Sequence, residues 1–162
     1  MIPGSVKQVA SVNIPTVGPV AFWHADTEQG GWCAGLQMSD GYWFGTGGDP
    51  QRIDGGGVIP GCFPTRDEHG FDWLSNFIDA RPLGGRQWQI RYGKVVAPGA
   101  VKVTDTVSGA STDVVDGDLF MLLIPEPNPP ASIPNSFPNT DLVAYNQTGS
   151  VVANLCPHCA GG

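Results

Sequence analysis

Hydrophobic and polar residues alternate most clearly in the second half of the chain. Residues 87–92 read Q-W-Q-I-R-Y, and residues 101–104 read V-K-V-T. A period of two is typical of a β-strand with one face in the core and one face in water. We therefore expect Trp88, Ile90 and Tyr92 to point inward and the intervening polar residues to face solvent. The apolar run at 119–124 is typical of a buried strand.

Turn sequences separate these runs and predict hairpins. An Asp-Gly pair at 40–41 lies between the apolar runs 32–38 and 42–46, which is a strong short-range hairpin signal. Further turn sequences occur at 108–109, 116–117 and 146–149. The last of them predicts a hairpin that closes the chain's regular part.

The first half of the chain is less regular. Residues 1–16 predict a loose lead-in with at most one short strand, and residues 17–23 a strand whose Pro19 favours a sheet edge. Helix and strand compete at 71–80, where we favour a strand or an irregular segment. Residues 47–70, rich in Gly, Pro and Asp, predict a long loop tied down at Cys62.

These elements predict an all-β fold. The expected architecture is an antiparallel β-sandwich, Greek-key or immunoglobulin-like, with long Gly/Pro-rich loops. Residues 125–139 contain six prolines and predict an extended connection outside any central strand. We expect one sandwich domain over residues 1–155 and a flexible C-terminal tail over residues 156–162.

Composition and charge narrow the function classes. Only 14% of the 162 residues are charged, and the net charge is −7. The eight Lys and Arg residues form no basic stripe, so we expect no nucleic-acid partner. No apolar stretch approaches the roughly 20 residues of a membrane span, so we expect no membrane insertion.

Four cysteines allow three pairings. We expect a Cys33–Cys62 disulfide, which would remove loop entropy worth roughly 3.6 kcal/mol. An even cysteine count and only three Lys favour an extracytoplasmic or cell-surface protein. The alternative is a virion or cytoplasmic protein with reduced cysteines.

The tail sequence Cys156-Pro157-His158-Cys159 resembles the active-site motif of DsbA-type thiol oxidases. In those enzymes the first cysteine begins a helix, and here three residues follow the motif, too few for a helix. Cys156, His158 and Cys159 could supply three of the four ligands of a zinc ion, with the remaining ligand drawn from elsewhere. Without zinc, the two cysteines would form a local disulfide or stay reduced. We expect no further cofactor.

Aromatic residues are the strongest candidates for a binding surface. Trp32, Tyr42, Trp43 and Phe44 lie on one predicted hairpin beside the Gly-rich loop. Exposed rings there could stack on sugars or anchor a protein partner, whereas the alternative is core packing. His24 precedes Asp26 by two residues and could act as a base or metal ligand, the alternative being a surface pair at a strand end. We identify no catalytic residue.

Three segments carry a resemblance to known proteins. They are W-Q-I-R-Y-G-K-V-V-A-P-G-A-V-K-V-T, V-V-D-G-D-L-F and L-V-A-Y-N-Q-T-G-S-V-V-A. Over about residues 86–155 the chain is similar to uncharacterised β-sandwich domains of actinobacterial exported or membrane-anchored proteins. The resemblance implies an extracytoplasmic binding, sensory or structural module.

We therefore expect a non-enzymatic extracytoplasmic binding or sensory module with a protein or glycan partner. One alternative is a structural subunit that assembles with copies of itself, such as a surface, filament or viral capsid component. A second alternative is a thiol-redox or metal-binding protein that uses the terminal C-x-x-C.

Overall fold

The structure is a computed structural model that describes residues 2, 4–44, 51–52, 61–125 and 142–155. These residues form antiparallel strands and one short 3₁₀ turn, so the predicted all-β class is confirmed. The strands are β1 (Lys7–Ile14), β2 (Gly18–Asp26), β3 (Trp32–Met38), β4 (Tyr42–Phe44), β5 (Gln51–Arg52), β6 (Gly61–Phe63), β7 (Phe71–Asp79), β8 (Gln87–Val95), β9 (Ala100–Asp105), β10 (Ser111–Asp113), β11 (Leu119–Pro125), β12 (Leu142–Asn146) and β13 (Val151–Leu155). The 3₁₀ turn η1 (Arg81–Leu83) joins β7 to β8.

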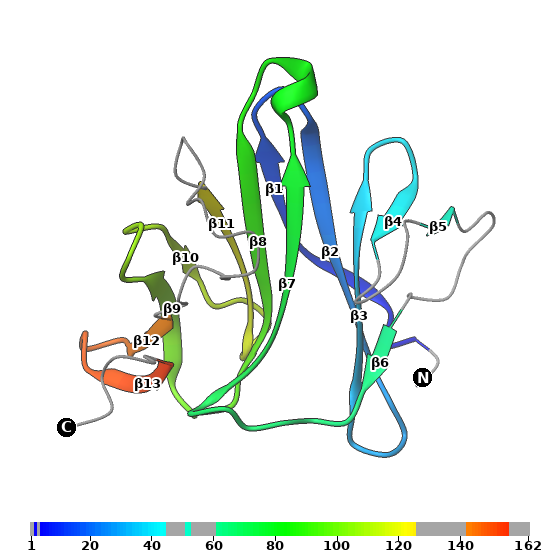
Figure 1. The fold of residues 1–162 in the computed structure, drawn as a ribbon. Coiled ribbons are helices and arrows are strands. Elements are labelled where there is room, and N and C mark those ends of the chain that lie inside the picture. The colour runs from blue at the N-terminus through cyan, green and yellow to red at the C-terminus, as the bar shows by residue number, and fades with distance from the viewer. Residues whose placement is uncertain (1, 3, 45–50, 53–60, 126–141, 156–162) are drawn as a thin grey trace.

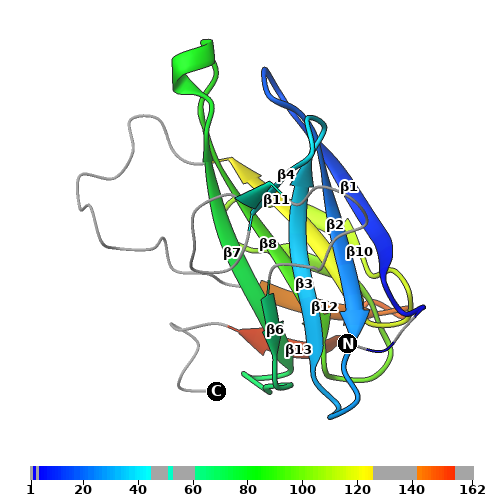
Figure 2. The ribbon, with the colours of Figure 1, turned by 90° about the vertical axis from the view of Figure 1, so that its right-hand side faces the viewer.

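The strands form three sheets. Sheet A has the order β1-β2-β3-β4-β5, with β6 also paired to β3. Sheet B has the order β11-β8-β7, and sheet C has the order β10-β9-β12-β13. In both ribbon views β12 and β13 run across the direction of β7 and β8 near one end of these strands (Figures 1 and 2). The Greek-key or immunoglobulin-like connectivity stays a prediction.

Sheet B contributes to two hydrophobic cores, one on each of its faces. On β11, Leu119 and Met121 pack with sheet A residues such as Phe22. The alternate residues Phe120 and Leu122 pack with residues of sheet C. Because side chains alternate between the two faces of a strand, the continuous apolar run at 119–124 follows from burial on both sides.

The prediction that the polar residues of β8 face water is wrong for two of them. Gln89 and Arg91 are both 1% exposed. Gln89 Nε2 donates a hydrogen bond to Ser75 Oγ at 2.9 Å, and the Arg91 guanidinium lies 4.6 Å from the centre of the Trp73 ring. Alternation showed which residues share a face, but it did not show that the polar face is covered as well.

The start of the chain is more regular than its sequence predicts. Residues 7–14 form the full-length strand β1, in which Val9 is an extra residue that shifts the register against β2. β2 lies between β1 and β3, so the edge position expected from Pro19 is wrong. Pro19 is nevertheless tolerated because pairing with β3 begins only at Val20, one residue further on. The missing N–H of Pro19 therefore breaks no bond on that side.

Most other predicted strands are confirmed. The 40–41 turn closes the β3–β4 hairpin, and the 146–149 turn closes the β12–β13 hairpin. Residues 71–79 form strand β7 rather than a helix. Residues 47–70 include strands β5 and β6, whereas 126–139 of the Pro-rich connection and the tail 156–162 lie outside the described residues. Among the described residues no helix is long and apolar enough to cross a membrane.

Candidate functional site

The outer face of sheet A carries small and uncharged polar side chains. Val20 and Phe22 of β2 point into the core, so Pro19, Ala21 and Trp23 point away from sheet B. The strand register places Ser11 of β1 and Gln37 of β3 on either side of Ala21. Polar groups from β1 and β3 therefore share one surface, on either side of the small residue Ala21 of β2.

This surface is hollowed. The hollow has a volume of about 290 Å³, and we call it the sheet A hollow. It is lined by Gln8, Ser11, Pro19, Ala21, Gln37, Met38, Ser39 and Gly41. None of the lining side chains carries a charge, although the chain as a whole has a net charge of −7.

Two tryptophans lie beside the hollow on the same face of sheet A. The ring centres of Trp23 and Trp43 are 5.8 Å apart. Trp23 pairs with Gln8 of the hollow on one side and with Gly35 on the other. Trp23 is half-buried, and its Nε1 is buried without a hydrogen-bond partner among the described residues.

The aromatic residues predicted for a binding surface are placed differently from one another. Trp43 is 6% exposed, whereas Tyr42 is 43% exposed at the start of β4, next to the turn that borders the hollow. Trp32 is fully buried, so its ring is not available at the surface. The side chain of Phe44 lies outside the described part of the structure.

Trp32 instead links sheet A to sheet B. Its Nε1 donates a hydrogen bond of 2.7 Å to Oδ2 of Asp72, the second residue of β7. The same carboxylate oxygen accepts a 2.9 Å hydrogen bond from the backbone N–H of Arg66. This contact ties the segment that follows β6 to the interface between the two sheets.

The predicted Cys33–Cys62 disulfide is present. It joins β3 to β6 at positions that are direct cross-strand partners. Cys33 is buried against Ala25 and Trp23 on the outer face of sheet A, and Cys62 is exposed. The bond therefore anchors β6 beside the tryptophan pair.

The interpretation of His24 and Asp26 as a surface pair is wrong for the histidine. His24 is 3% exposed, and its Nε2 lies 3.7 Å from Oδ1 of Asp26. Neither ring nitrogen has a hydrogen-bond partner in the described part of the chain. Burial lowers the pKa of His24 below its usual range, and the charge of Lys94 lowers it further, so the buried ring is held neutral.

Lys94 is a residue that the sequence did not single out. It lies on the same face of β8 as Ile90 and Tyr92, so the alternation of this strand could have placed it toward sheet A. Its Nζ lies 5.9 Å from the centre of the Trp32 ring and 3.9 Å from Oδ1 of Asp26. A cation therefore lies at the rim of the core that sheets A and B share.

The residues described here form no group of three or more His, Cys, Asp or Glu that could hold a metal ion. The predicted zinc or redox residues Cys156, His158 and Cys159 lie outside the described residues.

Comparison with known proteins found no match. No protein-family profile, no curated protein and no solved structure matches the chain.

Proposed function

We propose that this protein is a non-enzymatic binding module that takes an uncharged, hydroxyl-rich ligand, such as a glycan, in the sheet A hollow. The observation that carries the proposal is the uncharged polar lining of the hollow in an acidic chain. An ionic ligand would call for a complementary charge in the lining. Amide and hydroxyl groups both donate and accept hydrogen bonds, which matches the hydroxyl groups of a sugar.

The geometry of the hollow supports a small ligand. Its volume of about 290 Å³ is near the lower end of the range for small-molecule pockets. The backbones of Ser11 and Gln37 are fixed in paired strands, so ligand binding has to order only their side chains.

We further propose an extracytoplasmic location. The Cys33–Cys62 disulfide supports it, because structural disulfides persist in oxidising compartments. The resemblance to actinobacterial exported domains that the sequence suggests for residues 86–155 would imply the same location.

The test is binding of neutral oligosaccharides by wild-type protein and a Gln37→Ala variant. A glycan array selects the ligand, and calorimetry then measures its affinity. We expect Gln37→Ala to weaken binding about tenfold, because it removes hydrogen bonds of about 1 kcal/mol each. The matched control is Gln147→Ala, an exposed glutamine in the β12–β13 turn, which should leave the affinity unchanged.

Two results would contradict the proposal. One is the absence of binding to any neutral oligosaccharide on the array. The other is an unchanged affinity in the Gln37→Ala variant.

Assembly through sheet edges is the less favoured alternative. Edge strand β1 begins at Lys7 and carries the extra residue Val9, while edge strand β13 carries the extra residue Val152. Edge strand β10 has only three residues. At these three edges, charge, bulges or short length discourage edge-to-edge pairing. We therefore expect light scattering to give a monomer mass that does not change with concentration, and a growing mass would favour the assembly alternative.

A further inference from the structure

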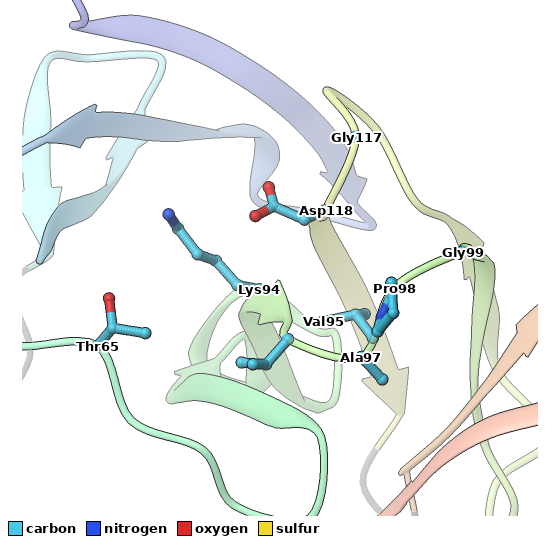
Figure 3. A pocket seen from close by; sticks show the side chains of 9 residues that line it. Thr65, Lys94, Val95, Ala97, Pro98, Gly99, Gly117 and Asp118 are labelled. Atoms are coloured by element: carbon cyan, nitrogen blue, oxygen red, sulfur yellow. The ribbon is translucent and has the colours of Figure 1, made fainter. Parts of the chain in front are cut away.

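A second pocket lies where β8 meets the turn before β11. Its volume is about 230 Å³ (Figure 3). It is lined by Thr65, Lys94, Val95, Val96, Ala97, Pro98, Gly99, Gly117 and Asp118. The backbone N–H of Val95 donates a 2.7 Å hydrogen bond to the carbonyl of Asp118, which fixes the two charged residues on adjoining walls.

The pocket holds one cation and one anion that are not paired with each other. Lys94 has a side chain only 17% exposed, and its closest carboxylate oxygen, in Asp26, is 3.9 Å away, too far for a hydrogen bond. The carboxylate of Asp118 enters no hydrogen bond or ion pair among the described residues, and in Figure 3 it lies on the same side of the pocket as the Lys94 amine. Both groups are left with unused hydrogen-bonding capacity.

We propose that this pocket binds a small zwitterion of the amino-acid class. The ligand's carboxylate would bind Lys94, and its ammonium group would bind Asp118. An anion alone would meet the carboxylates of Asp118 and Asp26, and a cation alone would meet Lys94. A ligand that carries both charges at short separation can pair with Lys94 and Asp118 at the same time.

The volume of the pocket and its Thr65 hydroxyl fit a ligand as small as an amino acid. A volume of about 230 Å³ lies below the range typical of drug-sized ligands. The Thr65 hydroxyl donates to the carbonyl of Gly30 at 2.7 Å, so its oxygen lone pairs remain available to accept from an ammonium group. This site is separate from the sheet A hollow, and it does not depend on the function proposed there.

The experiment is a titration followed by amide resonances of the ¹⁵N-labelled protein. Glycine is the probe, and acetate and methylamine, each with one of its two charges, are the comparison ligands. We expect glycine to shift the resonances of residues 94–99 and 117–118 with saturation, and the two half-ligands to bind at least about tenfold more weakly.

Variants at the two charges complete the test. Lys94→Met and Asp118→Asn should each weaken glycine binding about tenfold or more. The matched controls are Lys102→Met and Asp113→Asn, an exposed cross-strand pair on sheet C, which should bind glycine like the wild type. If Lys94→Met does not fold, Asp118→Asn decides alone, because Asp118 is partly exposed and holds no described side-chain bond.

The proposal is overturned by any of three results. The first is no saturable shift with glycine up to about 50 mM, far above a millimolar Kd. The second is acetate or methylamine binding as tightly as glycine, which would make the pocket a simple ion site. The third is wild-type affinity in Asp118→Asn.

Discussion

His24 lies at the rim of the core between sheets A and B, with its ring stacked on Trp32 at a centroid distance of 6.0 Å. The charged groups that act on it are Asp26 on its own strand, Lys94 on β8, Asp118 before β11 and Lys7 on β1. Burial is the largest effect and lowers the pKa of His24, and Lys94 acts in the same direction. Protonation would therefore place a second cation beside the partly buried Lys94.

This burial makes stability depend on pH in a definite direction. The unfolded chain binds a proton at His24 at a pKa of about 6.5, whereas the folded chain binds it only at lower pH. The stabilising contribution of neutral His24 is thus complete above about pH 6.5 and is lost as pH falls from there toward the lowered folded pKa.

We expect a His24→Phe variant to lose this acid sensitivity. Urea unfolding of the wild type should show a free energy of unfolding that decreases between about pH 7.5 and 5, and the decrease should be smaller in the variant. His69→Asn is the control, because His69 is exposed at a positive φ of 52°, a backbone angle that Asn tolerates. Equal slopes in wild type and His24→Phe would show that the histidine does not govern the acid response.

At the level of single elements, the strands were predictable and their surroundings were not. The alternation in β8 correctly grouped Ile90 with Tyr92, and Gln89 with Arg91. Gln89 and Arg91 contact Ser75 and Trp73 of β7 and lie on the face of sheet B that carries Leu122. That face packs toward sheet C, which comes later in the sequence, so local pattern could not show that the polar face is enclosed. For the same reason the sequence suggested a surface position for His24.

A β-bulge made the sequence prediction of which side chains share a strand face fail in β9. Val101 was expected to share a face with Val103, yet Val103 is buried and Val101 is 43% exposed. Pairing with β12 places Tyr145 opposite Lys102 and Asn146 opposite Ala100, so Val101 is an extra residue on β9. A bulge of this kind resets the alternation, and no turn residue in the sequence marks it.

The sequence predicted only part of the sheet A hollow. The Asp-Gly turn pointed to the β3–β4 hairpin, whose Gly41 lines the hollow, but nothing pointed to Gln8, Ser11 and Gln37, which line it from separate strands. These residues come from separate strands, and their meeting requires the register of β1 against β2 and of β2 against β3.

The Cys33–Cys62 disulfide holds the short strand β6 against β3. β6 pairs only with β3 in the described structure, and the Cys33–Cys62 bond closes a loop with a sequence separation of 29. Removing it with Cys33→Ser and Cys62→Ser together should cost about 3.6 kcal/mol, which corresponds to a fall in Tm of about 7–14 °C. Scanning calorimetry measures this shift.

The matched control is the double variant Cys156→Ser and Cys159→Ser, which changes the other two cysteines of the chain. We expect this control to keep a Tm within about 2 °C of the wild type, because the sequence predicts a flexible tail there and substitutions outside packed regions usually change stability little. A Tm for the Cys33/Cys62 variant that matches the control would show that β6 needs no covalent anchor.

On the scale of the whole molecule, sheet B is the shared layer. Its strand β11 sends Met121 toward sheet A and Leu122 toward sheet C. Each core thus includes side chains from the same backbone segment. Neither core can be exposed to water without also exposing one face of sheet B. This arrangement predicts that sheets A, B and C unfold together as one domain, as expected for residues 1–155.

Native-state hydrogen exchange in variants of the two cores tests this prediction. Leu122→Ala removes a side chain of the core between sheets B and C, and Leu36→Ala removes one of the core between sheets A and B. Each should lower the free energy of unfolding by about 2–5 kcal/mol. If unfolding is cooperative, each variant should lower the exchange free energy of amides in both β2 and β12 by the same amount. If Leu122→Ala instead lowers the exchange free energy of β12 amides alone, sheet C is a separate cooperative unit. In that case destabilising the core between sheets B and C leaves the stability of sheet A unchanged, although β11 contributes to both cores.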